Sequence, residues 1–569
     1  MRLIAILCIL VFPAAAWALA PRLAFSDLDS GPKTGNTDGK GSGAIVTIWG
    51  NNLGASQDAS VYVGEAEATA IYYWKNADGQ LPGGPADLYT YHKMQEIAFA
   101  IPTGAPDGAT TIRVRHNGVD SNTLPFFVRP GNIRFVKPGG NNTGTGLWNT
   151  PWASLSFAVS GAKIVPGDIV YSVGVGASSE VDVGASSKIT GTATTKTALV
   201  AYPGTTVACS TPTEYGTATI HNNVSGGVAN NFWTFSKLSI DTGFTALSIF
   251  GYARYIGLDL TGNLPGANQY SGAIGGNCTE LADATACSGH RILGAEIHDY
   301  GDRTGANNFH HVLYISNRSP HQAEAYEIGW SYFHNNTAYQ GIHIYDQNPG
   351  VGWRGTFNIH DNVIHNFAGN AINLNAAYPA SYNVYNNLIV LDPSYSPPGG
   401  VYAQPAAAFR IEANTASFKI FNNTVYGYAA ENQFQTAGTT TLQNNIIVDT
   451  RGVAYASHAA PTKSNNNLYY STNNGGMQIP SWDSAFYKAD PKFVDPATGD
   501  FRLQSVSPAI GSGNDTSATV PTDLLGTARS VPVALGAIGA VIGNGGTPPQ
   551  ILRLYQLSGL PIKGVAPQH

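Results

Sequence analysis

The first part of the chain, after a short apolar leader, is built from brief segments in which apolar and polar residues alternate. Such segments lie at residues 44–49, 60–63, 96–101 and 111–115, and Gly, Asn and Asp separate them. Because the side chains of a β-strand point alternately to its two faces, this pattern predicts strands with one buried face. Several short strands divided by turn residues are typical of an antiparallel sandwich. We therefore predict a β-sandwich at residues 21–129.

The middle of the chain carries a repeated pattern. Two polar residues, the second always Asn, precede an apolar stretch at Asp361-Asn362, Asn386-Asn387, Asn422-Asn423, Asn444-Asn445 and Asn466-Asn467. Their spacing is irregular, which a β-solenoid permits because each coil contacts only its neighbours and extra residues are placed in loops. Asn suits the corners of such coils because its amide can hydrogen-bond along the stack and because it tolerates the left-handed backbone conformation. We interpret these Asn residues as structural.

Two stretches resemble known families. Residues 47–54 and 61–64, with the turn at 101–108, resemble an IPT/TIG domain of the immunoglobulin-like (Ig-like) class, which implies a spacer or binding appendage without chemistry. Residues 133–171 hold a strand, a Gly-rich loop, a Trp/Pro segment, a short helix and Pro-Gly-Asp in that order. This order resembles the opening of secreted right-handed parallel β-helix proteins, many of which are polysaccharide lyases. The segment 490–510 similarly resembles the terminal coil of bacterial β-helix proteins.

The expected architecture is therefore all-β. We predict an Ig-like sandwich at residues 21–129, a right-handed parallel β-helix at 130–541 and a loosely packed tail at 542–569. The composition agrees, because charged residues make up only 12% of the 569, while Gly and Pro number 65 and 33. Helical bundles need many more charged residues on their polar faces. A net charge of −6 also argues against a nucleic-acid partner, which would require a basic face.

The first 20 residues have the features of a signal peptide. One Arg is followed by an apolar run and then by the small-residue pattern Ala18-Leu19-Ala20. We expect export to the periplasm, the cell surface or the medium, with no membrane span in the mature chain. An oxidising compartment would allow a bridge between Cys278 and Cys287 and leave Cys209 unpaired; the alternative is three inert thiols.

Four strands of the repeat region can be aligned by their apolar residues, at 312–316, 341–345, 371–375 and 408–412. The second and fourth positions are apolar and should point inward, so the third and fifth should point outward. The third positions form a column of Tyr314, His343, Asn373 and Arg410. The fifth positions form a second column of Ser316, Tyr345, Asn375 and Glu412, and His311, Gln340 and Asn370 lie at the strand entrances.

A third column consists of histidines. His298, His334 and His365 each follow an apolar residue at one repeat position and precede Asp or Asn. The column is either an outward ladder that satisfies its own hydrogen bonds or one flank of the same groove. Both readings stay open at the level of the sequence.

The column of four different polar side chains suggests catalysis on an acidic polysaccharide. β-Elimination of a uronate needs a base for the C5 proton, an acid for the leaving oxygen and a group that stabilises the carboxyl. His343 or Tyr345 could be the base and Tyr314 or Tyr345 the acid. Arg410 with Asn373 could hold the carboxylate, because the guanidinium fork matches its geometry. The expected substrate-binding residues are Asn373, Asn375, His311, Gln340, Glu412, His334 and His365.

Two other functions remain open. A glycoside hydrolase would use two carboxylates, and the candidates are Asp299, Asp302, Asp346 and Glu412. A non-catalytic β-helix would instead hold a glycan or matrix polymer on the same surface. We expect no cofactor and assign no metal ligand, because no Cys/His spacing indicates zinc. Some β-helix lyases hold Ca²⁺ in acidic clusters, and the central coils offer no tight group of three acids, so calcium dependence stays open.

Overall fold

The computed structural model describes the chain from residue 20 to residue 539. It leaves out residues 212–217, 225–227, 263–271, 279–283, 302–309, 347–350, 368, 376–379, 396–406, 412–415, 428–432, 435–438, 451–460, 473–478, 480–481 and 484.

The N-terminal part is a sandwich of two mainly antiparallel sheets. The first sheet has the order β1 (Arg22–Ser26), β3 (Ile45–Asn51), β7 (Gln95–Ala100) and β6 (Ile71–Asn76). The second has the order β2 (Ser30–Gly31), β10 (Leu124–Val128), β8 (Gly108–His116), β4 (Ala59–Val63) and β5 (Ala66–Glu67), with β9 (Val119–Asp120) beside β8. A short helix, α1 (Tyr89–His92), precedes β7.

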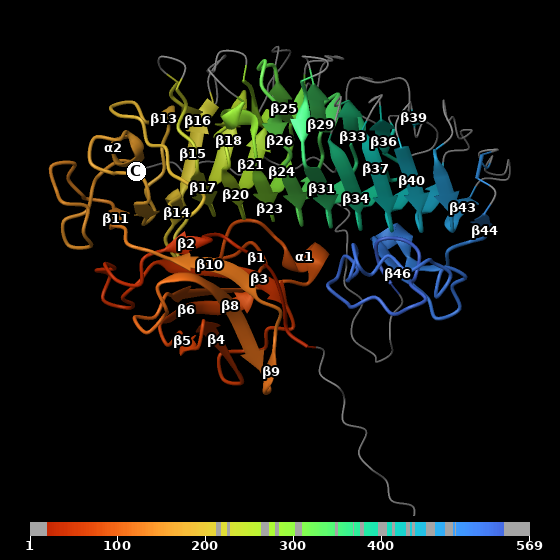
Figure 1. The fold of residues 1–569 in the computed structure, drawn as a ribbon, viewed down its shortest axis with the longest axis horizontal. Coiled ribbons are helices and arrows are strands. Elements are labelled where there is room, and N and C mark those ends of the chain that lie inside the picture. Colours follow the sequence, from red (N-terminus) through yellow and green to blue (C-terminus); the bar gives the residue numbers. More distant parts are fainter. Residues whose placement is uncertain are drawn as a thin grey trace, which may run out of the picture.

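The next part is a parallel solenoid, in which three long sheets share the coils (Figure 1). A short helix, α2 (Leu155–Val159), lies at its first end, with the Ser154 side chain accepting from the Phe157 amide. We name these three sheets I, II and III. From β14 to β39 the chain adds one strand to sheet I, one to sheet II and one to sheet III in each coil. Within the described residues these sheets contain 12, 11 and 9 strands, respectively.

Sheet I consists of β11 (Ile133–Val136), β12 (Ile169–Ser172), β14 (Thr197–Ala201), β17 (Trp233–Ser236), β20 (Arg254–Ile256), β23 (Arg291–Leu293), β27 (Glu327–Gly329), β31 (Thr356–His360), β34 (Ser381–Tyr385), β37 (Ser417–Phe421), β40 (Thr439–Gln443) and β42 (Lys463–Asn465). Sheet II consists of β15 (Ala208–Thr211), β18 (Ser239–Thr242), β21 (Asp259–Gly262), β24 (Glu296–His298), β28 (Tyr332–His334), β32 (Val363–His365), β35 (Leu388–Val390), β38 (Thr424–Tyr426), β41 (Ile446–Asp449), β43 (Asn467–Ser471) and β44 (Phe486–Lys488). Sheet III consists of β13 (Val181–Val183), β16 (Ala218–Asn222), β19 (Thr245–Ser248), β22 (Gly272–Asn277), β25 (His311–Asn317), β29 (Gln340–Asp346), β33 (Asn370–Asn375), β36 (Phe409–Ile411) and β39 (Gln433–Phe434).

Small elements complete the fold. A two-stranded sheet joins β26 (Ala323–Glu324) to β30 (Trp353–Arg354), and η1 (Thr285–Cys287) is a single turn of 3₁₀ helix. Cys278 is disulfide-bonded to Cys287, whereas Cys209 is a buried free thiol. In the part of the chain that the structure describes, no helix combines the length and apolar character needed to cross a bilayer. The predicted all-β architecture, a sandwich followed by a right-handed parallel β-helix, is confirmed.

The paired polar residues of the repeat form the corner between sheets I and II. The first residue of each pair has a left-handed backbone, with φ between 52° and 59° from Asp361 to Asn466. The second residue builds a continuous amide ladder inside the solenoid. The Nδ2 of Asn387 donates to Oδ1 of Asn423 at 3.0 Å, and Asn423 donates in the same way to Asn445. The sequence predicted two roles for Asn at the corners. The left-handed backbone belongs to the first residue of each pair, and the hydrogen bonding along the stack belongs to the second.

The sandwich packs against the outside of this corner. Lys237, at an early corner, places its Nζ 2.7 Å from Thr47 Oγ1 and 3.6 Å from Asp27 Oδ2. Farther along, His92 Nε2 lies 2.7 Å from the carbonyl oxygen of Asp361. The sandwich core also continues into the outer face of sheet I, where Tyr171 exchanges hydrogen bonds with the backbone of Ile45. The two parts are therefore joined by buried polar and apolar contacts.

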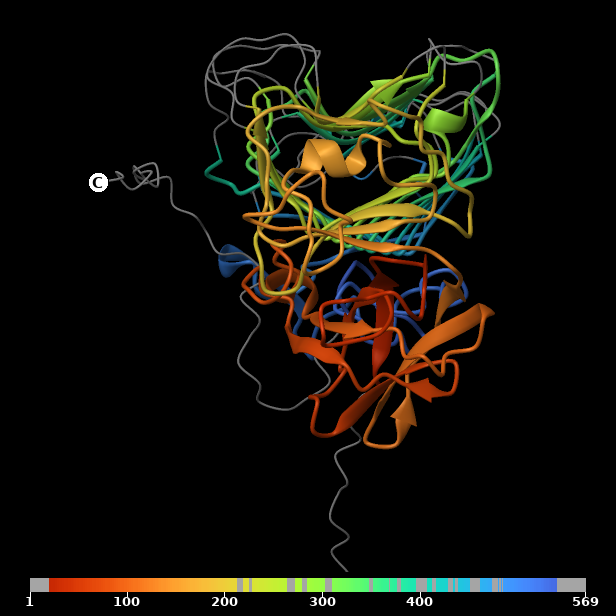
Figure 2. The same cartoon turned by 90° about the vertical axis from the view of Figure 1, so that its left-hand side faces the viewer.

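The C-terminal segment covers the same corner in the later coils (Figures 1 and 2). It contains β45 (Phe493–Asp495), η3 (Pro496–Thr498) and β46 (Asp500–Leu503). The Nδ2 atoms of Asn386, Asn422 and Asn444 donate to backbone oxygens of Thr522, Ala534 and Asn514.

This segment lies outside the coil stack, although the sequence indicated a terminal coil. The last parallel strand ends at Lys488, and β45 pairs with β46 in antiparallel fashion. The C-terminal segment lies there because it covers the outer face of sheet II. On that face Leu388, Ile446 and Leu468 are apolar, and they are buried in one cluster with residues of the C-terminal segment. Strands that are apolar on both faces need a cover.

The amide ladder generates a stability prediction. Asn423→Ala removes a buried side chain that donates to Asn445 and to the Val384 carbonyl, and that accepts from Asn387. Because these partners would stay buried and unsatisfied, we expect a loss of about 1–3 kcal/mol in the free energy of unfolding. Asn383→Ala is the matched control, since Asn383 is half-buried and donates to Asn358 on the outer face of sheet I. Urea unfolding should show the larger loss for Asn423; equal losses would contradict the structural role of the ladder.

Candidate functional site

The outward face of sheet III brings together the residues of the third-position column. Tyr314 on β25 is the register partner of His343 on β29, which is paired with Asn373 on β33 and through it with Arg410 on β36. Adjacent strands of a sheet lie about 4.8 Å apart, so the four side chains span roughly 14 Å. Sheet III lies on the opposite side of the solenoid from the sandwich and the C-terminal segment (Figure 2).

Four rings of this surface are in mutual contact. The His311 and His343 rings stack with centroids 4.6 Å apart, and their Nδ1 atoms are 2.7 Å apart, so one ring donates to the other. Tyr314 lies 5.4 Å from His343, and Tyr345 lies 5.2 Å from it. One imidazole and two phenol rings therefore pack around the His343 ring on adjacent coils.

Arg410 bears on the protonation of His343. Burial is the largest cause that lowers the pKa of His343, and the charges of His311 and Arg410 lower it further, to well below 6.5. The imidazole of His343 is therefore neutral at neutral pH. Arg410 donates from Nη1 to Tyr339 Oη at 3.0 Å. Tyr339 was not among the candidates, because it lies outside the aligned strand positions and only the fold brings it to Arg410.

The amides of this face differ in their hydrogen bonding. Among the described residues, Oδ1 of Asn373 is buried and has no hydrogen-bond partner. In contrast, Asn370 donates to Gln340 Oε1 at 3.1 Å and accepts from the Ala407 amide. Gln340 is thus engaged in the stack of sheet III, whereas the carbonyl oxygen of Asn373 is buried without a partner among the described residues.

Several candidates cannot be placed. Glu412 and Asp302 lie outside the described residues, and for Asn375 and Asp346 only the backbone is described. Asn375 is the register partner of Tyr345. Asp299 is described, and its Oδ2 lies 2.8 Å from His298 Nδ1.

The histidine column lies on sheet II, with His298, His334 and His365 as register partners. Each imidazole faces a carboxylate. His298 lies 3.2 Å from Asp259, His334 lies 3.2 Å from Glu296, and His365 lies 3.0 Å from Asp392. His334 and His365 are buried. These contacts favour the structural reading of this column, and substrate binding by His334 and His365 remains a prediction.

The outward column of sheet III extends toward the first coils. Gly275 is the register partner of Tyr314 and of Ser248, and the next coils place His221 and Asp182 in the same line. A Cβ built on Gly275 would meet, among the described residues, only the Tyr314 carbonyl oxygen at 3.5 Å. Two consecutive rungs therefore lack a large outward side chain. Sequence alignment missed this extension because these strands do not share the apolar pattern of the later four.

At the far end of this column His221 meets two carboxylates. Its Nδ1 lies 2.9 Å from Glu180 and 2.7 Å from Asp182, and the three ligand atoms lie within 4.8 Å of one another. A cation could take these three atoms as ligands, since carboxylate and imidazole suit several divalent metals. The three side chains are half-exposed and already bind each other, and we assign them no metal.

Comparisons with known proteins give remote structural likenesses only. No family model matches the chain, and no curated protein matches it. A GH136 lacto-N-biosidase from Eubacterium ramulus is 13% identical, with 63% of this chain and 67% of that chain covered and a TM-score of 0.36. An alginate lyase of the PL6 family is 13% identical over 68% and 57% of the two chains, with a TM-score of 0.38. A rhamnogalacturonan lyase is 12% identical over 70% and 95%, with a TM-score of 0.33. Because these TM-scores lie below 0.5, we take the fold from the strand pairing alone.

Two histidines should shape the pH dependence of stability in opposite ways. Burial alone would lower the pKa of His298, but hydrogen bonds and charges from Asp259 and Asp299 raise it to about 10. The stabilisation from His298 is thus complete below about pH 6.5 and is lost as the pH rises toward 10. His343 has a lowered pKa, so its contribution is complete above about pH 6.5 and declines as the pH falls.

Thermal unfolding across this pH range tests both signs. His298→Gln should flatten the alkaline decline of Tm and leave the acid decline unchanged. His343→Gln should flatten the acid decline and leave the alkaline decline unchanged. Parallel curves for the wild type and both variants would contradict these assignments.

Proposed function

We propose that the protein is an exported carbohydrate-active protein that binds an extended polysaccharide along the outward column of sheet III. The main support is the convergence of Tyr314, His343, Asn373 and Arg410 on four adjacent rungs of the face opposite the sandwich. Four different polar chemistries in register fit a site better than one repeated residue type, which would form a ladder. Export rests on the signal-peptide pattern of residues 1–20.

The reaction that these groups fit best is β-elimination on a uronate. The base accepts the C5 proton, a C4–C5 double bond forms as the bond from C4 to the glycosidic oxygen breaks, and an acid protonates the leaving oxygen. His343 is neutral and can accept a proton, while Tyr314 or Tyr345 beside it can donate one. Arg410 and Asn373 would hold the uronate carboxyl group, whose negative charge increases in the transition state.

An acidic substrate would itself raise the pKa of His343, the proposed base. The positive charge of Arg410 contributes to the low pKa of His343. A uronate carboxylate bound at Arg410 would offset that charge and raise the pKa of His343 toward the range in which a general base is effective. A neutral polysaccharide would not have this effect, which is the reason we favour an acidic substrate.

The reaction class can be read from the products. We expect purified protein, incubated with a panel of acidic polysaccharides, to generate the ultraviolet absorbance of an unsaturated uronate. New reducing ends without this absorbance would instead support a glycoside hydrolase that uses two carboxylates. Neither signal, together with retained polysaccharide binding, would support a non-catalytic binding protein. Including a chelator in parallel samples tests calcium dependence.

Substitutions test the column itself. His343→Ala and Arg410→Ala should each lower turnover by about 10²-fold or more, which is the usual scale for a general base or a charge stabiliser. Arg410→Lys should recover little, because lysine lacks the planar fork that pairs with a carboxylate. Lys419→Ala is the control, since Lys419 is an exposed cation on sheet I. Unchanged rates in folded His343→Ala and Arg410→Ala proteins would remove the column from the mechanism.

A further inference from the structure

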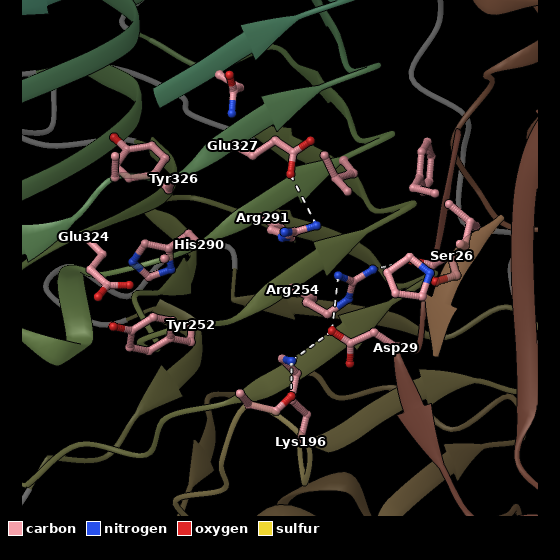
Figure 3. Close-up of a pocket in the computed structure, with 18 of the residues that line it drawn as sticks. Ser26, Asp29, Lys196, Tyr252, Arg254, His290, Arg291, Glu324, Tyr326 and Glu327 are labelled. Carbon is pink, nitrogen blue, oxygen red and sulfur yellow. Dashed lines mark hydrogen bonds and ion pairs between the residues drawn. The ribbon is translucent and has the colours of Figure 1, made fainter. Parts of the chain in front are cut away.

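A cavity lies between the sandwich and the outer face of sheet I, away from the column of sheet III. Its volume is about 450 Å³, which falls in the range typical of small-ligand sites, and such sites are frequent at domain interfaces. The sandwich contributes Asp29 and the start of β10, and the solenoid contributes β20, β23 and β27 with the preceding corners (Figure 3).

The floor of this cavity is held by a partly buried ion-pair network. Lys196 Nζ lies 2.8 Å and Arg254 Nη1 lies 3.5 Å from the same oxygen, Oδ2 of Asp29. Arg254 also donates to the backbone oxygens of Ser26 and Asp27. These contacts join the two parts of the chain, so the cavity has a defined shape.

Two carboxylates of the cavity are ionised acceptors. Burial would raise the pKa of Asp29, but the charges of Arg254 and Lys196 outweigh it and lower the pKa. Its second oxygen, Oδ1, is buried without a hydrogen-bond partner among the described residues. Glu327 has a pKa of about 2, because His360 and the arginines outweigh the effect of burial. Because Oδ1 of Asp29 is closed to a water-sized group, a ligand hydroxyl group would donate to the accessible parts of Asp29 and Glu327, whose side chains are 25% and 23% exposed.

One wall of the cavity is aromatic. The rings of Phe232 and Tyr252 stack with centroids 4.8 Å apart and an interplanar angle of 5°. A Cβ on Gly289 would lie 2.3 Å from the Tyr252 ring, so the glycine is what leaves room for this ring. Both aromatic residues have a left-handed backbone, like the other corner residues of the coils, and each lies just before a strand of sheet I.

The charges in the lining balance. Lys196 and Arg254 pair with Asp29, Glu324 pairs with Arg354 beside the cavity, and Arg291 lies 3.4 Å from Glu327 with half of its side chain exposed. A phosphate or a uronate would therefore meet as much repulsion as attraction. A neutral ring with several hydroxyl groups would instead donate to the carboxylates, accept from Arg291 and place its C–H groups against the aromatic wall.

From these contacts we infer that the cavity between the sandwich and sheet I is a binding site for a neutral pyranose unit. It is separate from the column of sheet III and does not depend on catalysis there. A polysaccharide or oligosaccharide end with a neutral sugar is the class of ligand that it would take.

Isothermal titration calorimetry and saturation-transfer NMR on the full chain test this site, with glucose, galactose, mannose and glucuronate as probes. We expect at least one neutral sugar to bind. Arg291→Gln and Asp29→Asn should each weaken that binding by about tenfold or more, the scale of a lost hydrogen bond to a charged group. Arg115→Gln is the matched control, because Arg115 is an exposed ion-paired arginine of the sandwich, on β8 beside β9 (Figure 1).

The outcomes separate this site from the proposed polysaccharide site. Binding that survives Arg410→Ala and fails in Arg291→Gln supports the cavity. The inference is overturned if no neutral sugar binds, if binding is lost in Arg410→Ala and kept in Arg291→Gln, or if glucuronate binds more tightly than each of the three neutral sugars. Because Asp29→Asn can weaken the interface, its circular dichroism and Tm are compared with those of Arg291→Gln, whose side chain is half-exposed.

Discussion

The stacked side-chain amides at the corner between sheets I and II fix the position of each later coil. An asparagine side chain carries both a donor and an acceptor, so one residue type can repeat without a break from Asn362 to Asn467. A slip of one residue between coils would turn every outward side chain inward. The buried ladder makes such a slip expensive, because its amides would lose their partners. The positions of Asn373 and Arg410 on sheet III depend on this constraint on the far side of the coil, whereas the coils of Tyr314 and His343 have Ala295 and Ser331 at the same corner, linked by bonds from the Ala295 amide to Ser331 and from the Ser331 amide to Asn362.

The same corner explains how the molecule divides its surfaces. Left-handed residues turn their side chains or carbonyl groups outward, and the sandwich and the C-terminal segment bind them in succession. Sheet II is apolar on its outer face in the later coils and is covered there. Sheet III carries polar side chains on its outer face. The chain thus uses its two non-solenoid parts to cover one side, and its chemically varied side chains lie on the other.

The repeat and the alternating strands were enough to predict the solenoid, the sandwich and the register of the four central rungs. The apolar residues at the second and fourth positions of each strand specify that register directly. Asn pairs predicted the corners, although the sequence could not separate the residue that bends the backbone from the one that stacks. The position of the C-terminal segment was missed, because an apolar outer face on sheet II looks the same in sequence as a buried strand. The contact of Tyr339 with Arg410 and the cavity at Asp29 join residues 71 and up to 334 positions apart, and no local pattern marks such pairs.

The outward column of sheet III is chemically different at its two ends. Glu180 and Asp182 stand beside the first coils, small residues follow at Ser248 and Gly275, and the rings and Arg410 come last. A polymer lying on this surface would meet negative charge at one end and positive charge at the other. Under the proposed function, a polymer whose charge is unevenly distributed would therefore lie in one direction, with its anionic residues at Arg410 and its less charged part over the first coils.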